Sequence, residues 1–261
     1  MLKLLQTAQE LETASKRLRQ ADYADYLQDW QPAWAGLATP FGVLRQRQTG
    51  FLLTVPLLSA IRAYFLARQS YRQTRLDYSE IIIKPAAVAW RDISANYLIF
   101  CEGWQAVTNP WFKHLPFQLA KGQILTGQTD TPLPPQMLNY GRWLIPQPQG
   151  GFKTGATFEP RFTDVLPTAA ARTMLLQALQ QAYAQMPAYS INAQQAGIRP
   201  ATLDKQPFMG AHPQYKNVLI FNGFGAKASM LAPWCAQQLC DYLLHEQALP
   251  AAMEVNRYEF A

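Results

Sequence analysis

Short continuous runs of apolar residues alternate along the chain with stretches in which apolar residues recur every three or four positions. The runs are short enough to be buried strands, and the periodic stretches are typical of amphipathic helices. The expected strands are residues 41–47, 81–83, 88–90, 96–101, 121–126 and 218–221, and the expected helices are residues 2–20, 56–72, 168–186 and 229–244. The pattern therefore predicts an α/β (α+β) fold.

The segments between these elements carry turn and loop signals. Residues 138–146 and 152–156 flank a Pro- and Gly-containing turn at 147–151, which predicts a β-hairpin. Residues 21–40 are rich in Trp, Tyr and Pro and are expected to be irregular. Residues 196–200 and 204–210 are expected to form extended loops and short strands.

The most informative stretch is residues 217–244. An apolar run is followed by the turn Asn222-Gly223-Phe224-Gly225 and then by a helical stripe, made of Leu231, Trp234, Cys235, Leu239, Tyr242 and Leu243. Pro233 is tolerated only near the start of a helix, so the helix begins close to Ser229. A strand, a glycine turn and a helix start together present backbone N–H groups to an anion or an electron-rich ligand. The alternative is a tight turn that binds no ligand.

Composition narrows the class of protein. The chain has 261 residues, of which 49% are hydrophobic and 15% charged, so it is globular with one large domain or two small ones. We expect no transmembrane helix, because no apolar run reaches about 18 residues. We expect no signal peptide, because Glu10 and Glu12 lie in the first helix and no cleavage site follows an apolar core.

The distribution of charge, cysteine and histidine argues against a nucleic-acid-binding protein and against a metal site. The net charge of +6 is spread out, and the arginine-rich segment 62–75 is read as a solvated helix face, so no nucleic-acid partner is expected. Three cysteines cannot all pair, which favours a reducing, cytoplasmic setting. The three histidines are far apart in sequence and lack acidic or cysteine partners at ligand spacing, so no metal site is expected.

Five segments, in this order and spacing, carry a resemblance. They are residues 97–104 (YLIFCEGW), 115–126 (LPFQLAKGQILT), 155–160 (GATFEP), 197–210 (GIRPATLDKQPFMG) and 217–233 (NVLIFNGFGAKASMLAP). From about Thr39 onward the chain resembles the FAD-dependent oxidoreductases of the D-amino-acid oxidase and glycine oxidase-like family. The resemblance implies a partial FAD domain interleaved with a substrate domain on a mixed or antiparallel sheet flanked by helices.

The same resemblance implies a division of the chain and a cofactor site. Residues 1–104 would contain the first helical segment, FAD-domain strands and part of the substrate domain; residues 105–196 would be mainly substrate domain; residues 197–261 would return to the FAD domain. The implied cofactor-binding residues are Gly103, Trp104, Gly223, Phe224, Gly225, Ala226, Lys227, Ala228 and Ser229. The glycine turn and helix start would face the pyrimidine edge of a noncovalently bound flavin, where reduction places negative charge. Lys227 would add positive charge, or is a surface lysine.

The implied substrate is a small amine or amino acid, oxidised by hydride transfer from the C–H beside the nitrogen to flavin N5. Arg199 matches an arginine that binds the substrate carboxylate in glycine-oxidase-like members; the alternative is a structural ion pair, for instance with Asp204. Tyr140 and Trp143 are candidates to line the substrate cavity, and sheet packing is their alternative role. No catalytic base is assigned, because this chemistry depends on orienting the C–H over the flavin.

The sequence departs from the family at two places. No GxGxxG fingerprint follows an N-terminal strand, so we expect the 261-residue chain alone to bind FAD weakly or not at all. Without that segment, residues 97–101 and 218–221 should expose apolar faces and promote association. Ala228 stands where the family often has glycine.

Two other functions remain open at this stage. The segment Gly223–Ala228 fits GxGxxA, which would indicate an NAD-binding protein if residues 253–255 formed the next parallel strand. The chain is also compatible with a degenerate or partial family member that acts as a binding or assembly module without catalysis.

Overall fold

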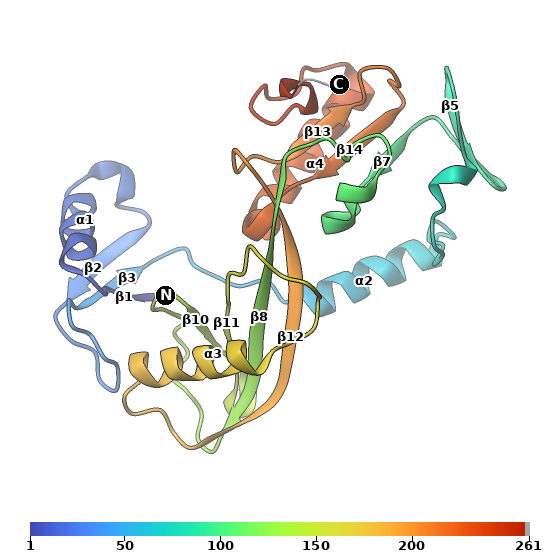
Figure 1. Ribbon diagram of the computed structural model, residues 1–261. Coiled ribbons are helices and arrows are strands. Elements are labelled where there is room, and N and C mark those ends of the chain that lie inside the picture. The colour runs from blue at the N-terminus through green and yellow to red at the C-terminus, as the bar shows by residue number, and fades with distance from the viewer. Residues whose placement is uncertain (259–261) are drawn as a thin grey trace. The chain divides into compact units, whose positions relative to one another are not determined.

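A computed structural model describes residues 1–258 of the chain. Its contacts divide the chain into two compact units, each made of two stretches of sequence. Unit 1 comprises Met1–Phe51 and Lys121–Gly197, and unit 2 comprises Leu52–Ala120 and Ile198–Ala261. Figure 1 traces the elements along the chain. The division into a cofactor domain and a substrate domain remains a proposal.

An eight-stranded sheet dominates unit 1, with the order β12-β8-β11-β10-β9-β1-β3-β2. Its strands are β1 (Leu2–Leu4), β2 (Leu27–Gln31), β3 (Val43–Gln46), β8 (Phe117–Thr129), β9 (Leu138–Asn139), β10 (Trp143–Pro146), β11 (Gly151–Gly155) and β12 (Tyr189–Thr202). The pair β1–β9 is parallel, whereas β1–β3, β2–β3, β9–β10, β10–β11 and β8–β11 are antiparallel. The sheet is therefore mixed, as predicted.

Two helices cover opposite faces of this sheet. Helix α3 (Ala169–Ala182) packs through Leu179 and Ala182 on the face that carries Leu2, Leu4 and Val43. Helix α1 (Ala8–Leu18) packs through Ala14 on the other face, against Leu5, Leu27 and Leu44. Because Val43 and Leu44 are adjacent in β3, strand alternation places them on opposite faces. Each helix begins at a threonine whose hydroxyl accepts a hydrogen bond from the backbone three residues on, Thr7 for α1 and Thr168 for α3.

Unit 2 contains two three-stranded sheets. One has the order β13 (Phe208–Ala211), β14 (Val218–Asn222) and β7 (Leu98–Phe100), in which β14 is antiparallel to β13 and parallel to β7. The other is an antiparallel meander of β4 (Ile81–Lys84), β5 (Ala87–Trp90) and β6 (Ile93–Ala95). Helix α4 (Ala228–His245) packs on one face of the first sheet through Cys235 and Leu239, and an aromatic cluster that includes Phe100, Phe112 and Phe208 covers the other.

Helix α2 (Thr54–Ala67) has no buried residue. The short 3₁₀ helices are η1 (Ala21–Tyr23), η2 (Tyr78–Glu80), η3 (Gly103–Thr108), η4 (Pro148–Gly150), η5 (Gly225–Lys227) and η6 (Val255–Arg257). None of the helices within residues 1–258 is both long enough and apolar enough to cross a membrane.

The structure confirms most of the predicted elements. The strand pair at 81–90, the hairpin of β10 and β11, the helix at 168–186 and the strand, turn and helix at 217–244 are all present. Helix α4 begins at Ala228, one residue before the expected start, and Pro233 lies in its second turn.

Four expectations were wrong in detail. Residues 2–4 form strand β1 rather than the start of a helix, because they pair with β3 and β9, which are distant in sequence. Residues 21–40, expected to be irregular, contain β2, and residues 196–200 belong to the long strand β12. In α4, Trp234 is 49% exposed, because the buried stripe runs through Cys235 and Leu239, one residue further round the helix.

Residues 97–101 and 218–221 were both expected to expose apolar faces, and the structure confirms this only for the first segment, which contains β7. In β14, Val218, Leu219 and Ile220 are fully buried, because α4 and the aromatic cluster cover its faces and β13 and β7 flank it. In and beside β7, Tyr97 and Ile99 are exposed, and β7 is an outer strand of its sheet.

Candidate cofactor-facing site

The candidate site lies where two neighbouring parallel strands of unit 2 end. β7 runs into Cys101-Glu102-Gly103-Trp104, and β14 runs into the turn 222–225 and helix α4. Because parallel strands end at the same edge of a sheet, these two loops lie side by side. The crevice beyond the carboxyl ends of such strands is where open α/β sheets bind ligands.

A single side chain joins the two loops. The Nδ2 of Asn222 donates a hydrogen bond to the carbonyl of Gly103 at 2.8 Å, and its Oδ1 accepts one from the N–H of Gly223 at 2.8 Å. Asn222 is only 3% exposed, so both bonds are made in a desolvated environment. The amide fixes the turn after β14 relative to the loop after β7.

Three glycines shape these loops in different ways. Gly223 has a φ of +82°, and a Cβ there would lie 2.6 Å from the side chain of Thr202, so both backbone and space require glycine. Gly103 has a φ of +62°, and no heavy atom of the described residues lies within 4 Å of where its Cβ would be. Gly225, with φ +55°, would place a Cβ 3.5 Å from Ala201. Gly103 thus leaves open space beside the backbone, where a ligand can approach.

The start of α4 is open to a ligand. No side chain among residues 1–258 caps it, and the residues from Ala226 to Met230 are all exposed. The first backbone N–H groups of the helix therefore keep unused donor capacity and the positive end of the helix dipole. Ala228 has ordinary helical angles (φ −53°, ψ −46°), so the backbone does not require glycine at this position.

Glu102 anchors the loop after β7, a role that the sequence did not indicate. Its Oε1 accepts a hydrogen bond from the Tyr78 hydroxyl at 2.5 Å, and its Oε2 accepts one from Asn109 Nδ2 at 2.8 Å. Burial, and then the neighbouring Glu102 carboxylate, raise the pKa of Tyr78 to about 12, so this phenol remains a donor. The partners are 24 and 7 residues away in sequence, which no local pattern reveals.

The predicted cofactor residues fall into this one region. Gly103 and Trp104 begin η3, Gly223 is buried, and Phe224 is half-buried with its ring centroid 4.8 Å from that of Phe221. Gly225, Ala226 and Lys227 form η5, and Ala228 and Ser229 begin α4. The structure thus brings together the two sequence-distant parts of the predicted set within unit 2.

The predicted substrate residues are distributed between the two units. Arg199 lies half-buried on β12 in unit 2; Asp204, its suggested partner, forms an ion pair with Arg257 at 2.8 Å. Tyr140 is buried in the core of unit 1, where its hydroxyl lies 2.7 Å from Thr154 Oγ1. Trp143 is half-buried on β10 beside Gly155. For Tyr140 these contacts favour the alternative role of sheet packing.

The arrangement after α4 does not fit the NAD-binding alternative. That reading needs residues 253–255 to form a strand parallel to β14. The chain instead makes one bridge, in which Glu254 runs parallel to Met209 of β13, and then enters η6 at Val255. Because β13 is antiparallel to β14, this segment is antiparallel to β14. Gly223–Ala228 is therefore not the first half of a dinucleotide-binding βαβ unit.

The described residues offer no cluster of three or more His, Cys, Asp or Glu side chains that could ligate a metal. Cys101, Cys235 and Cys240 are free thiols.

Comparisons with known proteins agree with the geometry. The family described as FAD dependent oxidoreductase matches residues 78–242. Glycine oxidase of Bacillus subtilis is 26% identical over 165 residues, which are 60% of this chain and 43% of the relative. Glycine oxidase of Pseudomonas putida is 30% identical over 130 residues, 49% of this chain and 36% of the relative. The chain thus spans less than half the length of these relatives.

Solved structures share the fold over almost the whole chain. Glycine oxidase from Geobacillus kaustophilus has a TM-score of 0.82 and 19% identity, covering 99% of this chain and 75% of its own. Iminodiacetate oxidase from Chelativorans sp. BNC1 has a TM-score of 0.73 and 21% identity, covering 97% and 75%. Since the family match alone covers more than half of the chain, and includes β7, β14 and the start of α4, the protein belongs to the family of FAD-dependent oxidoreductases.

Proposed function

We propose that this chain is the catalytic part of an oxidoreductase that oxidises the C–N bond of a small amine or amino acid. The observation that carries the proposal is the loop pair at the ends of β7 and β14, joined by Asn222 beside the uncapped start of α4. When bound, FAD supplies a hydride acceptor for the C–H beside the amine nitrogen.

The residues present fit a flavin at this place. Gly103 leaves room for close approach to the backbone, and the uncapped N–H groups at the start of α4 would donate hydrogen bonds to the electron-rich edge of the flavin ring. Lys227 is exposed next to these donors and adds a positive charge. Together these groups would bind and orient the flavin and favour negative charge on its ring.

The substrate would be held by side chains outside the two cofactor loops. Arg199 is assigned to the substrate carboxylate, because its guanidinium fork matches a carboxylate with two parallel hydrogen bonds. Trp143 is assigned to the substrate cavity, whereas the contact of the Tyr140 hydroxyl with Thr154 in the core of unit 1 favours sheet packing for Tyr140. The named activities of the relatives, glycine oxidase and iminodiacetate oxidase, direct the choice of substrate to small amino and imino acids.

Two further assignments complete the proposal. The free thiols of all three cysteines support a reducing, cytoplasmic setting. The exposed side chains at β7 and on α2 support association through these surfaces.

Titrating the purified 261-residue chain with FAD and, separately, with NAD tests the cofactor assignment. Binding is followed by the quenching of the chain's tryptophan fluorescence. We expect the Kd for FAD to be weaker than about 1 µM, since the chain has no GxGxxG turn for the pyrophosphate. Lys227→Gln should weaken FAD binding. Lys113→Gln serves as the control, because it removes the same charge from an exposed position five residues after the end of η3. A tightly bound yellow cofactor absorbing near about 450 nm would refute the weak binding. NAD binding in place of FAD would refute the assignment itself.

A second assay tests the reaction. The FAD-loaded chain is mixed with glycine, sarcosine or a D-amino acid, and reduction of an artificial dye is followed. Arg199→Gln should raise KM for substrates with a carboxylate and leave the rate with simple amines unchanged. If FAD binds but no substrate reduces the dye, the chain is a binding or assembly module, which is the competing function.

A further inference from the structure

The glycine turn after β14 rests on the two ends of the loop that joins β12 to β13. A Cβ on Gly223 would lie 2.6 Å from Thr202 Cγ2, at the end of β12, and 3.3 Å from Phe208 Cδ2, at the start of β13. Thr202 is 2% exposed and Phe208 is fully buried. Because buried side chains are closely packed, the backbone of Gly223 keeps its position only while Thr202 and Phe208 keep theirs.

The loop between these two residues is tightly folded. The hydroxyl of Thr202 donates a hydrogen bond to the carbonyl of Gln206 at 2.8 Å, and the N–H of Gln206 donates one to Asp204 Oδ1 at 3.0 Å. Lys205, inside the loop, has a φ of +62°, a conformation that is uncommon for a residue other than glycine. Such a conformation persists where surrounding contacts maintain it.

Arg257, the last residue of η6, supplies contacts of this kind from a distant part of the chain. Its Nε donates to Asp204 Oδ2 at 2.8 Å, and its Nη2 donates to Asp204 Oδ1 at 3.3 Å and to the Gln206 carbonyl at 3.2 Å. Its Nη1 donates to the carbonyl of Glu254 at 2.9 Å. The planar guanidinium fork thus joins a carboxylate and two backbone carbonyls, a geometry that a lysine ammonium does not reproduce.

The same guanidinium also packs on aromatic rings. Its carbon lies 4.8 Å from the centre of the Phe208 ring and 5.0 Å from that of the Tyr258 ring. The Arg257 side chain is only 15% exposed, so these cation–π contacts are largely shielded from water, which strengthens them. Arg257 therefore contacts Phe208 directly, and it reaches Thr202 through the Gln206 carbonyl to which both donate.

We propose that Arg257 is a positioning residue for the cofactor-facing turn. Its bonds fix Thr202 and Phe208, these side chains fix Gly223, and Gly223 leads into the uncapped start of α4. The inference rests on the proposed function, because it gives Arg257 an effect on how this turn meets the flavin. Arg257 acts through its neighbours and not by contact with the cofactor.

FAD titration of Arg257→Lys in the full chain tests the proposal, because this variant keeps the positive charge and loses the planar fork. Where circular dichroism shows both proteins to be folded, the variant should bind FAD about fivefold more weakly than the wild type. Unchanged affinity overturns the proposal. If the wild type itself binds no FAD, the proposed function is refuted, and hydrogen exchange, which needs no cofactor, still tests the role of Arg257.

Hydrogen exchange without FAD separates positioning from overall stability. Amides of the turn, residues 223–227, exchange through local opening, whereas those of the buried residues 218–220 in β14 require opening of the core. Arg257→Lys should speed exchange in the turn by about fivefold. A residue that only stabilises the fold would change exchange in β14 and leave the turn unchanged, so an unchanged turn overturns the proposal.

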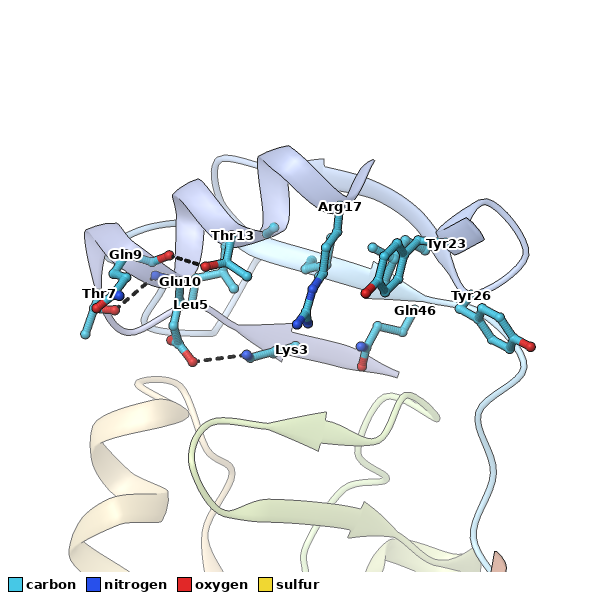
Figure 2. Close-up of a pocket in the computed structure, with 13 residues that line it drawn as sticks. Lys3, Leu5, Thr7, Gln9, Glu10, Thr13, Arg17, Tyr23, Tyr26 and Gln46 are labelled. Carbon is cyan, nitrogen blue, oxygen red and sulfur yellow. Dashed lines mark hydrogen bonds and ion pairs between the residues drawn. The ribbon is translucent and has the colours of Figure 1, made fainter. Parts of the chain in front are cut away.

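Two arginines of unit 1 provide matched controls. Arg45 donates to both carboxylate oxygens of Asp29, as Arg257 does to those of its own partner. Arg17 lies 5.3 Å from the centre of the Tyr23 ring, and Figure 2 shows these two side chains beside each other. Arg45→Lys and Arg17→Lys should leave FAD affinity and exchange in the turn unchanged. If Arg45→Lys weakens FAD binding as much as Arg257→Lys, lost stability is responsible and the proposal is overturned.

A double-mutant cycle tests the path through the loop. Thr202→Val keeps the shape of the side chain and removes its bond to the Gln206 carbonyl, so it should also weaken FAD binding and speed exchange in the turn. Because both side chains act through that carbonyl, Thr202→Val/Arg257→Lys should lose less affinity than the product of the two single losses. Fully independent losses overturn the proposed path. Thr202→Val, which changes no charge, provides the test if Arg257→Lys is poorly folded.

Discussion

At the scale of single residues, Asn222 has the most structural influence on the candidate site. Asn222→Ala leaves the Gly103 carbonyl and the Gly223 N–H without their buried partner, so we expect a loss of about 1–3 kcal/mol in the free energy of unfolding. Urea denaturation measures this loss of stability. The variant should also bind FAD more weakly than the wild type. Asn192→Ala, on an exposed part of β12, is the control and should change stability by less than about 0.5 kcal/mol. Equal losses in both variants would contradict the role of Asn222.

Asp204 makes stability depend on acid pH. Burial alone would raise the pKa of Asp204, but hydrogen bonds from Arg257 and the Gln206 backbone outweigh it and lower the pKa to about 2. A carboxyl with a depressed pKa stabilises the fold above its unfolded value of 3.8, and this contribution is lost as the pH falls toward about 2.

Asp204→Asn removes that contribution. At neutral pH the variant should be less stable by about 1–2 kcal/mol, and the difference from wild type should shrink between about pH 4 and pH 2. Thermal or urea unfolding across this range measures it. Asp25→Asn, at an exposed position, is the control and should change stability at neutral pH by less than about 0.5 kcal/mol. A difference that stays constant down to pH 2 would show that Arg257 does not perturb this carboxyl.

At the scale of elements, the loop after β7 and the turn between β14 and α4 depend on their glycines for different reasons. Gly103→Ala meets only the cost of a positive φ, about 1–2 kcal/mol. Gly223→Ala adds a steric clash with Thr202, so we expect about 2–5 kcal/mol. Gly50→Ala, with an open surface and no positive φ, should change stability by less than about 0.5 kcal/mol. The loss in the free energy of unfolding should therefore be smallest for Gly50→Ala, larger for Gly103→Ala and largest for Gly223→Ala. A loss for Gly103→Ala as large as that for Gly223→Ala would exclude the clash.

The same elements show how far sequence reasoning reaches. The start of α4 was predictable, because Gly223 and Gly225 permit the positive φ angles of a tight turn and Pro233 restricts where a helix can begin. The first strand was not predictable, because Leu2 to Leu4 are compatible with either a helix or a strand. They form a strand because they pair with β3 and β9, which are distant in sequence. The start of α1 could have been found from Thr7 and Glu10, because a threonine followed three residues later by a glutamate is a helix-start signal. In the structure Thr7 Oγ1 accepts a hydrogen bond from the Glu10 N–H, and the Glu10 carboxylate accepts one from the Gln6 N–H.

The site was predictable in its parts and not in its connections. Gly103 and Gly223 each follow an apolar strand, which is a local signal. The Asn222–Gly103 bond spans 119 residues and the Tyr78–Glu102 bond spans 24, so only the folded chain reveals them. Long-range pairings of this kind are determined by topology, which a single sequence specifies only weakly.

At the scale of the whole molecule, the unusual feature is the exposed apolar surface of α2 and of the outer strand β7. Every residue of α2 is exposed, among them Val55, Leu58, Ile61 and Phe65, and a helix that is apolar all round is normally buried. Tyr97 and Ile99 are exposed at the outer strand β7 of the same unit. Surfaces of this type mark places of association.

We therefore expect the 261-residue chain to self-associate increasingly as its concentration is raised. The double variant Val55→Lys/Leu58→Lys places charges at positions that are 68% and 64% exposed, so it should suppress association while leaving the fold intact. Sedimentation velocity measures the association, and circular dichroism checks the fold. The control Leu244→Lys replaces a leucine that is 73% exposed on α4 of the same unit. If this control suppresses association equally, net charge and not the α2 surface is responsible. If neither variant changes it, the β7 edge becomes the place to test, with Ile99→Lys.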